Sequence, residues 1–209
     1  MLEARNLEIT RGDRRLFGGM TAELRPGTLL RVAGSNGSGK TSLLRALCGL
    51  LLPTAGEVRW NGENIRTLRE EFWKNLVHIG HHNALKDELT ARENLAVLCA
   101  LSGISAGEEQ RSAALTGFGL AGREHLPAKS LSQGQRRRTA LARLALSAAL
   151  PLWILDEPFA ALDAAAVIQM QAIIGTHLAN GGMVVLTTHQ DAPITAPAVV
   201  ELDLDRVRG

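Results

Sequence analysis

The chain has 209 residues, of which 45% are hydrophobic and 21% are charged. This composition is that of an ordinary globular protein, and the length suits one domain with a substantial core. The formal net charge of +2 is too small to create the strong positive field that nucleic-acid binding uses. We expect neither a signal peptide nor a stretch of about 20 apolar residues able to span a bilayer.

Cys48 and Cys99 lie in stretches that are predicted to be apolar helices. Their spacing does not match a metal site, so we expect reduced, buried thiols in a cytosolic protein. The densest basic run is Arg136–Arg138, and we interpret it as the solvent-facing side of a helix.

The first third of the chain has the pattern of short strands separated by turns. Strands are predicted at residues 2–10 and 14–24, with a turn between them. A third strand, at 29–33, leads into a glycine-rich stretch, and a helix pattern follows at 42–47. Later strands are predicted at residues 57–60, 76–80, 152–155, 183–187 and 198–202.

The middle of the chain changes to a helical pattern, from residue 85 to about residue 146. Thr90 and Glu93 have the spacing of a capping box at the start of one helix. Strand patterns return only after this region. We therefore interpret residues 83–148 as a helical subdomain inserted into a core made of 1–82 and 149–209, and we expect another helix at about 164–179 in that core.

The glycine-rich stretch is GSNGSGKT, which matches G-x-x-x-x-G-K-[ST] at every position. Glycines let backbone N–H groups close around a phosphate chain, where a Cβ would clash. Lys40 is placed to reach the β- and γ-phosphates, and the Thr41 hydroxyl is a ligand for Mg²⁺. The predicted phosphate-binding residues are Gly34, Ser35, Asn36, Gly37, Ser38, Gly39, Lys40, Thr41 and Ser42.

Two adjacent carboxylates follow the apolar run at 152–155. This is the pattern of a buried parallel strand that carries acids at its carboxyl end, where α/β sheets bind their ligands. We predict that Asp156 holds Mg²⁺ opposite Thr41. Glu157 is predicted to orient or deprotonate the attacking water.

Another candidate site is LSQGQ at residues 131–135, at the start of a predicted helix. Ser132 and Gly134 would offer a hydroxyl and backbone N–H groups to an anion there. Taken alone, this pattern is only a helix N-cap. Its position between the glycine-rich stretch and the two acids distinguishes it from an ordinary N-cap and favours a role in anion binding.

The order GSNGSGKT, LSQGQ, LWILDEP, Ala161-Leu162-Asp163 and Thr188-His189 resembles that of ABC-type ATPases over essentially the whole chain. The resemblance implies a P-loop NTPase fold of the α/β class. It has a RecA-like parallel core, an N-terminal antiparallel β-subdomain and an inserted helical subdomain. It also implies that ATP and Mg²⁺ are the cofactors, and that the catalytic residues are Lys40, Glu157 and His189.

The family resemblance also implies that two copies of the chain cooperate in a homodimer. Ser132 and Gly134 would contact the γ-phosphate of ATP bound to the second copy. Asp163 would lie at the dimer interface, and His189 would contact the γ-phosphate.

The sequence departs from the family pattern at two places. His82 stands where the family usually has a Gln, and an imidazole there is a candidate to accept from a water or to bind a metal. Alternatively, His78, His81 and His82 together form a metal site, although no cysteine accompanies them. The family often stacks adenine on an aromatic residue, whereas this chain offers Arg11, or alternatively Phe17.

Within the family, the chain is similar to the ATP-binding subunits of bacterial cytochrome c maturation systems, which are also called heme exporters. The similarity lies in Gly80-His81, in 89–95 and in LSQGQRRRTALARL. It implies integral membrane partners (the B, C and D components of the maturation system) and a peripheral location on the cytoplasmic face of the inner membrane. It also implies that ATP hydrolysis is coupled to heme export or to release of a heme-loaded chaperone. The alternatives are the ATPase of another ABC exporter or importer, a soluble ABC scaffold, and a regulatory cassette that only binds nucleotide.

Overall fold

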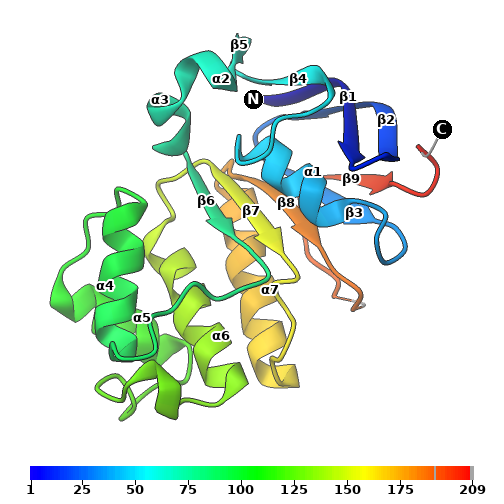
Figure 1. The fold of residues 1–209 in the computed structure, drawn as a ribbon. Helices are drawn as coiled ribbons and strands as arrows, with labels where there is room; N and C mark the ends of the chain where they lie inside the picture. The colour runs from blue at the N-terminus through cyan, green and yellow to red at the C-terminus, as the bar shows by residue number, and fades with distance from the viewer. Residues whose placement is uncertain (191, 208–209) are drawn as a thin grey trace.

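The computed structural model describes residues 1–190 and 192–207. It contains an antiparallel sheet, a parallel sheet and helices on both sides of the latter (Figure 1). The antiparallel sheet has the order β2-β1-β4-β5. Its strands are β1 (Leu2–Arg11), β2 (Arg14–Leu24), β4 (Ala55–Trp60) and β5 (Glu63–Asn64).

The parallel sheet carries the nucleotide-related motifs at one edge. It has the order β6-β7-β8-β3-β9. Its strands are β3 (Thr28–Ala33), β6 (Leu76–Ile79), β7 (Leu152–Asp156), β8 (Met183–Thr187) and β9 (Ala198–Asp203). Because all pairs are parallel, the segments that follow β3, β6, β7 and β8 emerge at the same edge of the sheet.

The longer helices are arranged around this sheet. The helix α1 (Lys40–Leu47) contacts β1 of the antiparallel sheet as well as β7 and β8, so it lies between the two sheets. On the other side of the parallel sheet lie α4 (Ala91–Leu101), α5 (Glu108–Gly117), α6 (Gln133–Leu141) and α7 (Ala164–Ala179), as Figure 1 shows. Shorter turns are α2 (Ile65–Leu68), α3 (Glu70–Trp73), η1 (Ala128–Ser130) and η2 (Ala142–Leu146).

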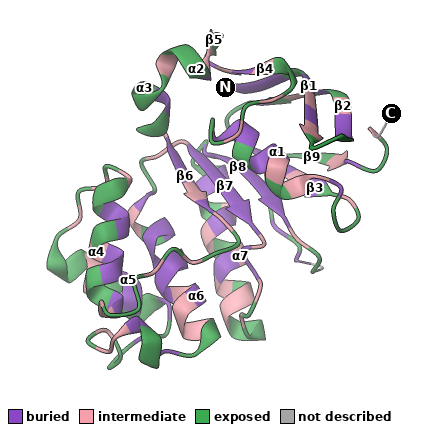
Figure 2. Ribbon diagram, viewed as in Figure 1, coloured by how far each residue is buried: buried purple, intermediate pink, exposed green. Residues whose placement is uncertain are grey.

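The strands β7 and β8 of the parallel sheet are buried on both faces, and this explains the continuous apolar run of β7. Leu152 and Ile154 belong to the core that is shared with α1 and the antiparallel sheet. Trp153 and Leu155 belong to the core that is shared with α7 and the helical region. Buried residues accordingly fill the centre of the parallel sheet in Figure 2. Such burial on both faces is expected of parallel strands covered by helices.

Several local predictions are confirmed. Thr90 and Glu93 form the expected capping box at the start of α4, and the helix expected at about 164–179 has these bounds. Both cysteines of the described chain are buried free thiols, and burial raises the pKa of Cys99 above its usual value. The short helices α2 and α3 were not predicted. The division into core and helical subdomain at 83–148 stays a prediction.

Within the described residues, no helix has the length and apolar character needed to cross a membrane.

Candidate nucleotide-binding and hydrolysis site

The glycine-rich loop connects β3 to α1, and its backbone geometry requires glycine. Gly34, Gly37 and Gly39 have φ angles of 143°, 79° and 105°, a region that side chains with a Cβ rarely adopt. A Cβ on Gly34 would also lie 2.6 Å from the Oγ of Ser38, which is fully buried beneath the loop. The loop shape therefore explains why the motif specifies glycine at positions 34 and 39, and it favours glycine at position 37 as well.

The end of the loop leaves the N-terminus of α1 open. Gly39 is the N-cap, and neither a side-chain cap nor an acidic residue in the first turn occupies the free N–H groups. An uncapped helix N-terminus of this kind attracts an anion. Lys40 Nζ donates to the carbonyl oxygens of Gly34 and Ser35 at 2.7 and 3.1 Å. These neutral acceptors hold the ammonium group over the loop, where phosphate oxygens would bind it more strongly.

Ser35 is held from the opposite side by the C-terminal segment. Asp205 accepts from the backbone N–H of Ser35 at 2.6 Å and from its hydroxyl at 2.9 Å. Pairing of β9 with β3 brings this segment next to the loop. The contact was not predicted, because nothing in the local sequence links residues so far apart.

The first acid, Asp156, lies at the end of β7 beside the loop. Its Oδ2 accepts from the Thr41 hydroxyl at 2.9 Å, and its Oδ1 accepts from the Thr187 hydroxyl at 2.7 Å. Asp156 is almost completely buried. A carboxylate and a hydroxyl so close together are the hard oxygen donors that Mg²⁺ prefers, so the residues present fit this metal. Thr187 fixes the carboxylate and was not singled out from the sequence.

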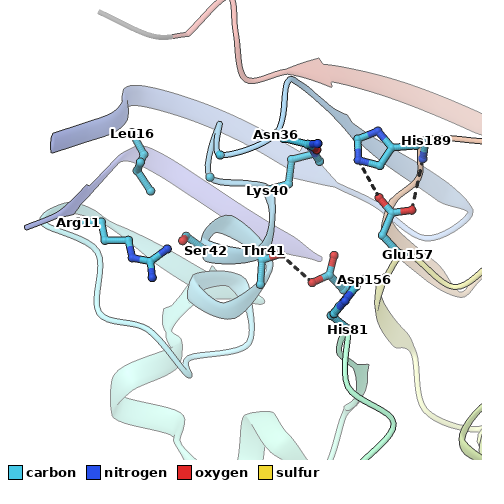
Figure 3. Close-up of a pocket in the computed structure, with 12 residues that line it drawn as sticks. Arg11, Leu16, Asn36, Lys40, Thr41, Ser42, His81, Asp156, Glu157 and His189 are labelled. Atoms are coloured by element: carbon cyan, nitrogen blue, oxygen red, sulfur yellow. Dashed lines mark hydrogen bonds and ion pairs between the residues drawn. The ribbon is translucent and has the colours of Figure 1, made fainter. Parts of the chain in front are cut away.

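The second acid, Glu157, has a left-handed backbone with φ 49°. Its N–H donates to the Thr187 hydroxyl at 2.9 Å. Its Oε2 accepts from the backbone N–H of His189 at 3.3 Å, and its Oε1 lies 3.4 Å from His189 Nε2. The ends of β7 and β8 thus bring the carboxylate and the imidazole together, as Figure 3 shows.

These groups surround one cavity of about 430 Å³. In Figure 3, Lys40 and Thr41 lie to the left of Asp156 and Glu157, and His189 lies beside Glu157 at the upper right. Its wall also includes Arg11, Leu16, Asn36, Gly37, Gly39, Ser42 and His81. The cavity therefore combines a phosphate loop, two carboxylates and an imidazole, which is a set suited to binding and hydrolysing a nucleoside polyphosphate.

Arg11 and Phe17 were the two candidates for stacking on a base. Arg11 is exposed and lines the cavity. Phe17 has no exposed surface and packs beneath Gly39, since a Cβ on that glycine would lie 3.2 Å from the Phe17 ring. Of the two, Arg11 is thus the residue whose side chain is accessible from the cavity.

The segment after β6 carries two adjacent histidines, and the predicted role of His82 stays a prediction. His81 lines this cavity and an adjoining one, whereas His82 lines the adjoining one, whose wall also includes Thr41. The two rings meet edge to face with centroids 5.5 Å apart.

Burial lowers the pKa of His78 below its usual value. Among the described residues, no group of three His, Cys, Asp or Glu side chains is placed to hold a metal ion.

Ser132, Gly134 and Asp163 do not line the cavity. Ser132 is the N-cap of α6, and its Oγ accepts from the Gln135 N–H at 3.2 Å, which leaves the hydroxyl proton available to an external anion. A Cβ on Gly134 would lie 2.9 Å from the carbonyl oxygen of Ala161. Asp163 caps α7 and forms an ion pair with Arg138. The three residues therefore gather where the start of α6 meets the segment before α7.

The interpretation of Arg136–Arg138 as a solvent-facing run is wrong for its central residue. Arg137 is 4% exposed, and its guanidinium donates to the backbone oxygens of Asp156 and Glu157 at 2.9 and 2.7 Å. Burial lowers the pKa of Arg137, although Asp156 and Glu157 oppose this shift through their charges. A cation can be buried here because backbone oxygens from distant parts of the chain accept hydrogen bonds from its N–H groups.

The comparison with known protein families agrees with this site. The family model described as ABC transporter matches residues 17–160, and the chain belongs to this family of ATP-binding cassettes. The chain is an ABC transporter ATPase.

Relatives within the family share one name, cytochrome c biogenesis ATP-binding export protein CcmA. The protein of that name from Aromatoleum aromaticum is 53% identical over 207 residues, which cover 99% of this chain and 96% of the relative. The one from Dechloromonas aromatica is 54% identical over 204 residues, which cover 98% and 100%. The chain thus falls, at high identity and over nearly full length, among proteins that carry this name.

Solved structures confirm the predicted fold class. An ATP-binding subunit of an ABC transporter superposes with a TM-score of 0.81 at 26% identity, covering 90% of this chain and 79% of that one. A dimeric bacterial ABC transporter cassette superposes with a TM-score of 0.84 at 23% identity, covering 98% and 95%.

Proposed function

We propose that this protein is the ATP-hydrolysing subunit of a bacterial export system for cytochrome c biogenesis, where it couples ATP hydrolysis to heme export or to release of a heme-loaded chaperone. The proposal rests on high identity, over nearly the whole chain, to proteins named for cytochrome c biogenesis and export. The observation that carries the hydrolytic part is the carboxylate of Glu157, held beside His189 in the cavity that Lys40 and Thr41 also line.

Binding of the nucleotide begins with the loop and Lys40. In the proposal, the backbone N–H groups of Gly37–Thr41 surround the phosphates, and the Lys40 ammonium group leaves the Gly34 and Ser35 carbonyls for the β- and γ-phosphate oxygens. The exchange is favourable because a charge-assisted bond replaces bonds to neutral oxygens. Arg11, at the far end of the cavity, is proposed to lie against the base.

Thr41 and Asp156 are the proposed ligands of Mg²⁺. When bound, the metal would neutralise charge on the β- and γ-phosphates. Thr187 keeps Asp156 oriented toward the loop, since its hydroxyl donates to the carboxylate oxygen that Thr41 does not contact.

Hydrolysis needs a water placed in line with the γ-phosphate. Glu157 is proposed to accept a proton from this water or to orient it. His189, at 3.4 Å from the carboxylate, is proposed to contact the γ-phosphate while its backbone N–H holds Glu157 in place. His82, which lines the adjoining cavity together with Thr41, stays a proposed ligand for a metal or water.

The active form is proposed to be a head-to-tail homodimer. Ser132 and Gly134 lie outside the cavity of their own chain, and Ser132 retains a hydroxyl proton to donate. A second copy would bring this helix N-terminus to the γ-phosphate, with Asp163 at the interface. Moving an equilibrium from 1:99 to 99:1 takes roughly 5.5 kcal/mol of differential binding, which charge-assisted bonds formed only in the closed dimer can supply.

The membrane partners are proposed to be integral membrane proteins of the same system (its B, C and D components), with this chain at the cytoplasmic face of the inner membrane. The proposal follows from the export function in the relatives' names.

Two experiments test the proposal. The first is the steady-state ATPase rate of the purified Glu157→Gln variant, which should bind ATP but hydrolyse it about 10²–10³ times more slowly. An unchanged rate would contradict the role of Glu157. The second is membrane fractionation with and without co-expressed integral membrane partners, combined with an assay of heme delivery to cytochrome c. A protein that stays in the soluble fraction, or an unchanged heme delivery with Glu157→Gln, would favour another cargo or a soluble scaffold.

A further inference from the structure

One side chain joins three separate parts of the hydrolysis site. Arg137, on α6, donates through Nη2 to the backbone oxygens of Asp156 and Glu157 at 2.9 and 2.7 Å. Through Nη1 it donates to the backbone oxygen of Gly80 and to Asn83 Oδ1 at 3.1 and 3.2 Å. The guanidinium therefore connects the helix that starts with Ser132, the end of β7 and the histidine-containing segment after β6.

Burying this cation is unfavourable unless its hydrogen bonds compensate. The Arg137 side chain has almost no exposed surface, and each of its four acceptors is a neutral oxygen. Its Nε finds no hydrogen-bond partner within the described chain. A buried aliphatic side chain would avoid these costs, so a fold-stabilising role alone is a weak reason to place a guanidinium here.

The bond to Glu157 bears on catalysis because the backbone of that residue is strained. Glu157 has φ 49°, which is unfavourable for a residue with a Cβ. Three hydrogen bonds fix its peptide groups. Thr187 accepts from its N–H at 2.9 Å, and its carbonyl oxygen accepts from Arg137 at 2.7 Å and from the Ala160 N–H at 3.2 Å. The bond from Arg137 is the shorter of the two to the carbonyl oxygen and comes from a charged donor, so its loss would let the backbone relax and move the carboxylate.

The other end of the guanidinium holds the segment that forms one wall of the site. Gly80 and Asn83 flank His81 and His82, and His81 lines the nucleotide cavity. The same segment, together with Arg137 and Glu157, lines a second cavity of about 570 Å³ at the start of α6. A displacement of this segment, or of α6, would be transmitted through the rigid planar guanidinium to the carbonyl oxygen of Glu157.

We propose that Arg137 is a positioning residue for ATP hydrolysis, and that it couples the position of the Gly80–Asn83 segment and of α6 to the position of the Glu157 carboxylate. It touches no reacting atom. The inference rests on the catalytic role proposed for Glu157. It predicts that the position of the Glu157 carboxylate depends on the Arg137 guanidinium, whereas the affinity for nucleotide does not.

The decisive variant is Arg137→Lys, which keeps the positive charge. A single ammonium group cannot reproduce the fork that spans acceptors on two segments. We expect kcat to fall by about tenfold to a hundredfold, as for a displaced catalytic group. Nucleotide affinity, measured with a fluorescent ATP analogue, should change by less than about twofold. Arg136→Lys is the matched control, because Arg136 is the neighbour on the same helix and pairs instead with Asp87 at 2.6 Å. It should retain the wild-type kcat.

A purely structural role would give a different result. If Arg137→Lys lowers the melting temperature and the nucleotide affinity together with kcat, or leaves kcat unchanged, the inference is overturned. Asn83→Ala provides an independent test, since it removes one acceptor of the guanidinium and leaves the cation in place. We expect kcat to fall by a few fold with unchanged nucleotide affinity. A wild-type kcat in Asn83→Ala would overturn the coupling even if Arg137→Lys does not fold.

A parallel measurement of Glu157→Gln separates this inference from the proposed function. If Glu157→Gln hydrolyses ATP at the wild-type rate, the catalytic assignment itself fails. If Glu157→Gln is inactive while Arg137→Lys and Asn83→Ala behave as wild type, the assignment stands and only the positioning role of Arg137 is wrong.

Discussion

Thr187→Val gives the sharpest test of how the two acids are held. Thr187 has no exposed surface, and its hydroxyl both donates to Asp156 at 2.7 Å and accepts from the Glu157 N–H at 2.9 Å. Valine has nearly the same shape but removes both hydrogen bonds. The hydrogen bond to the carboxylate is worth about 1.5–3 kcal/mol, and an unpaired buried N–H costs about 1–3 kcal/mol.

These two contributions share one hydroxyl, so we expect a combined loss of about 3–4 kcal/mol in the free energy of unfolding. At about 2–4 °C per kcal/mol for a chain of this size, the melting temperature should fall by roughly 6–16 °C. Circular dichroism during thermal unfolding, without nucleotide, measures this change. Thr187→Ser is the matched control, because it keeps the hydroxyl and should lose no more than about 1.5 kcal/mol. If Thr187→Val melts at the same temperature as Thr187→Ser, the hydroxyl does not hold the acids as described.

Three further predictions concern the loop, the start of α6 and the acid stability of the fold. Lys40→Ala should weaken ATP binding by about tenfold or more, because it removes a charge-assisted bond worth about 1.5–3 kcal/mol; calorimetric titration checks this. Gly134→Ala should lower ATPase activity without changing nucleotide affinity, because its Cβ would lie 2.9 Å from the Ala161 carbonyl oxygen and would displace the start of α6. Burial lowers the pKa of His177, which is stacked on Trp153, from 6.5 to about 4, so the folded state favours the neutral imidazole. Stability should therefore decline as the pH falls from 6.5 toward 4, and urea titrations of His177→Phe should show a weaker decline.

The sequence predicted that its two main motifs would lie side by side, because the motifs are local and the topology is regular. Lys40 and Thr41 follow one parallel strand, and Asp156 and Glu157 follow another. The carboxyl ends of parallel strands meet at one edge of a sheet, so the two motifs come together once both strands are recognised. Thr41 and Asp156 accordingly lie within hydrogen-bonding distance, at 2.9 Å.

The burial of Arg137 could not be predicted from the sequence near it. A run of arginines at a helical start indicates exposure, because a guanidinium is rarely buried without partners. Three of the four acceptors of Arg137 are backbone oxygens, those of Gly80, Asp156 and Glu157, and all four are distant in the sequence. Backbone oxygens leave no trace in the residue types, so neither the burial nor the contact has a local signal.

The positions of the two histidines after β6 have no local signal in the sequence either. His81 and His82 are adjacent, and the segment that carries them is irregular, so no periodicity indicates which ring faces the nucleotide cavity. The helices α2 and α3 have four residues each, which is too short for a helical period to be recognised. The contact of Asp205 with Ser35 depends on the pairing of β9 with β3.

The most direct test of the account is the oligomeric state of Glu157→Gln, measured by light scattering with ATP and Mg²⁺, with ADP, and without nucleotide. If Ser132 and Gly134 of one copy bind the γ-phosphate held by the other, particles of twice the mass of the chain should form with ATP and Mg²⁺. They should not form with ADP or without nucleotide. Ser132→Arg, which blocks the helix N-terminus, should abolish them while ATP binding persists. A monomer in saturating ATP, or a dimer equally abundant with ADP and in Ser132→Arg, would contradict the proposed sharing of the nucleotide between two copies.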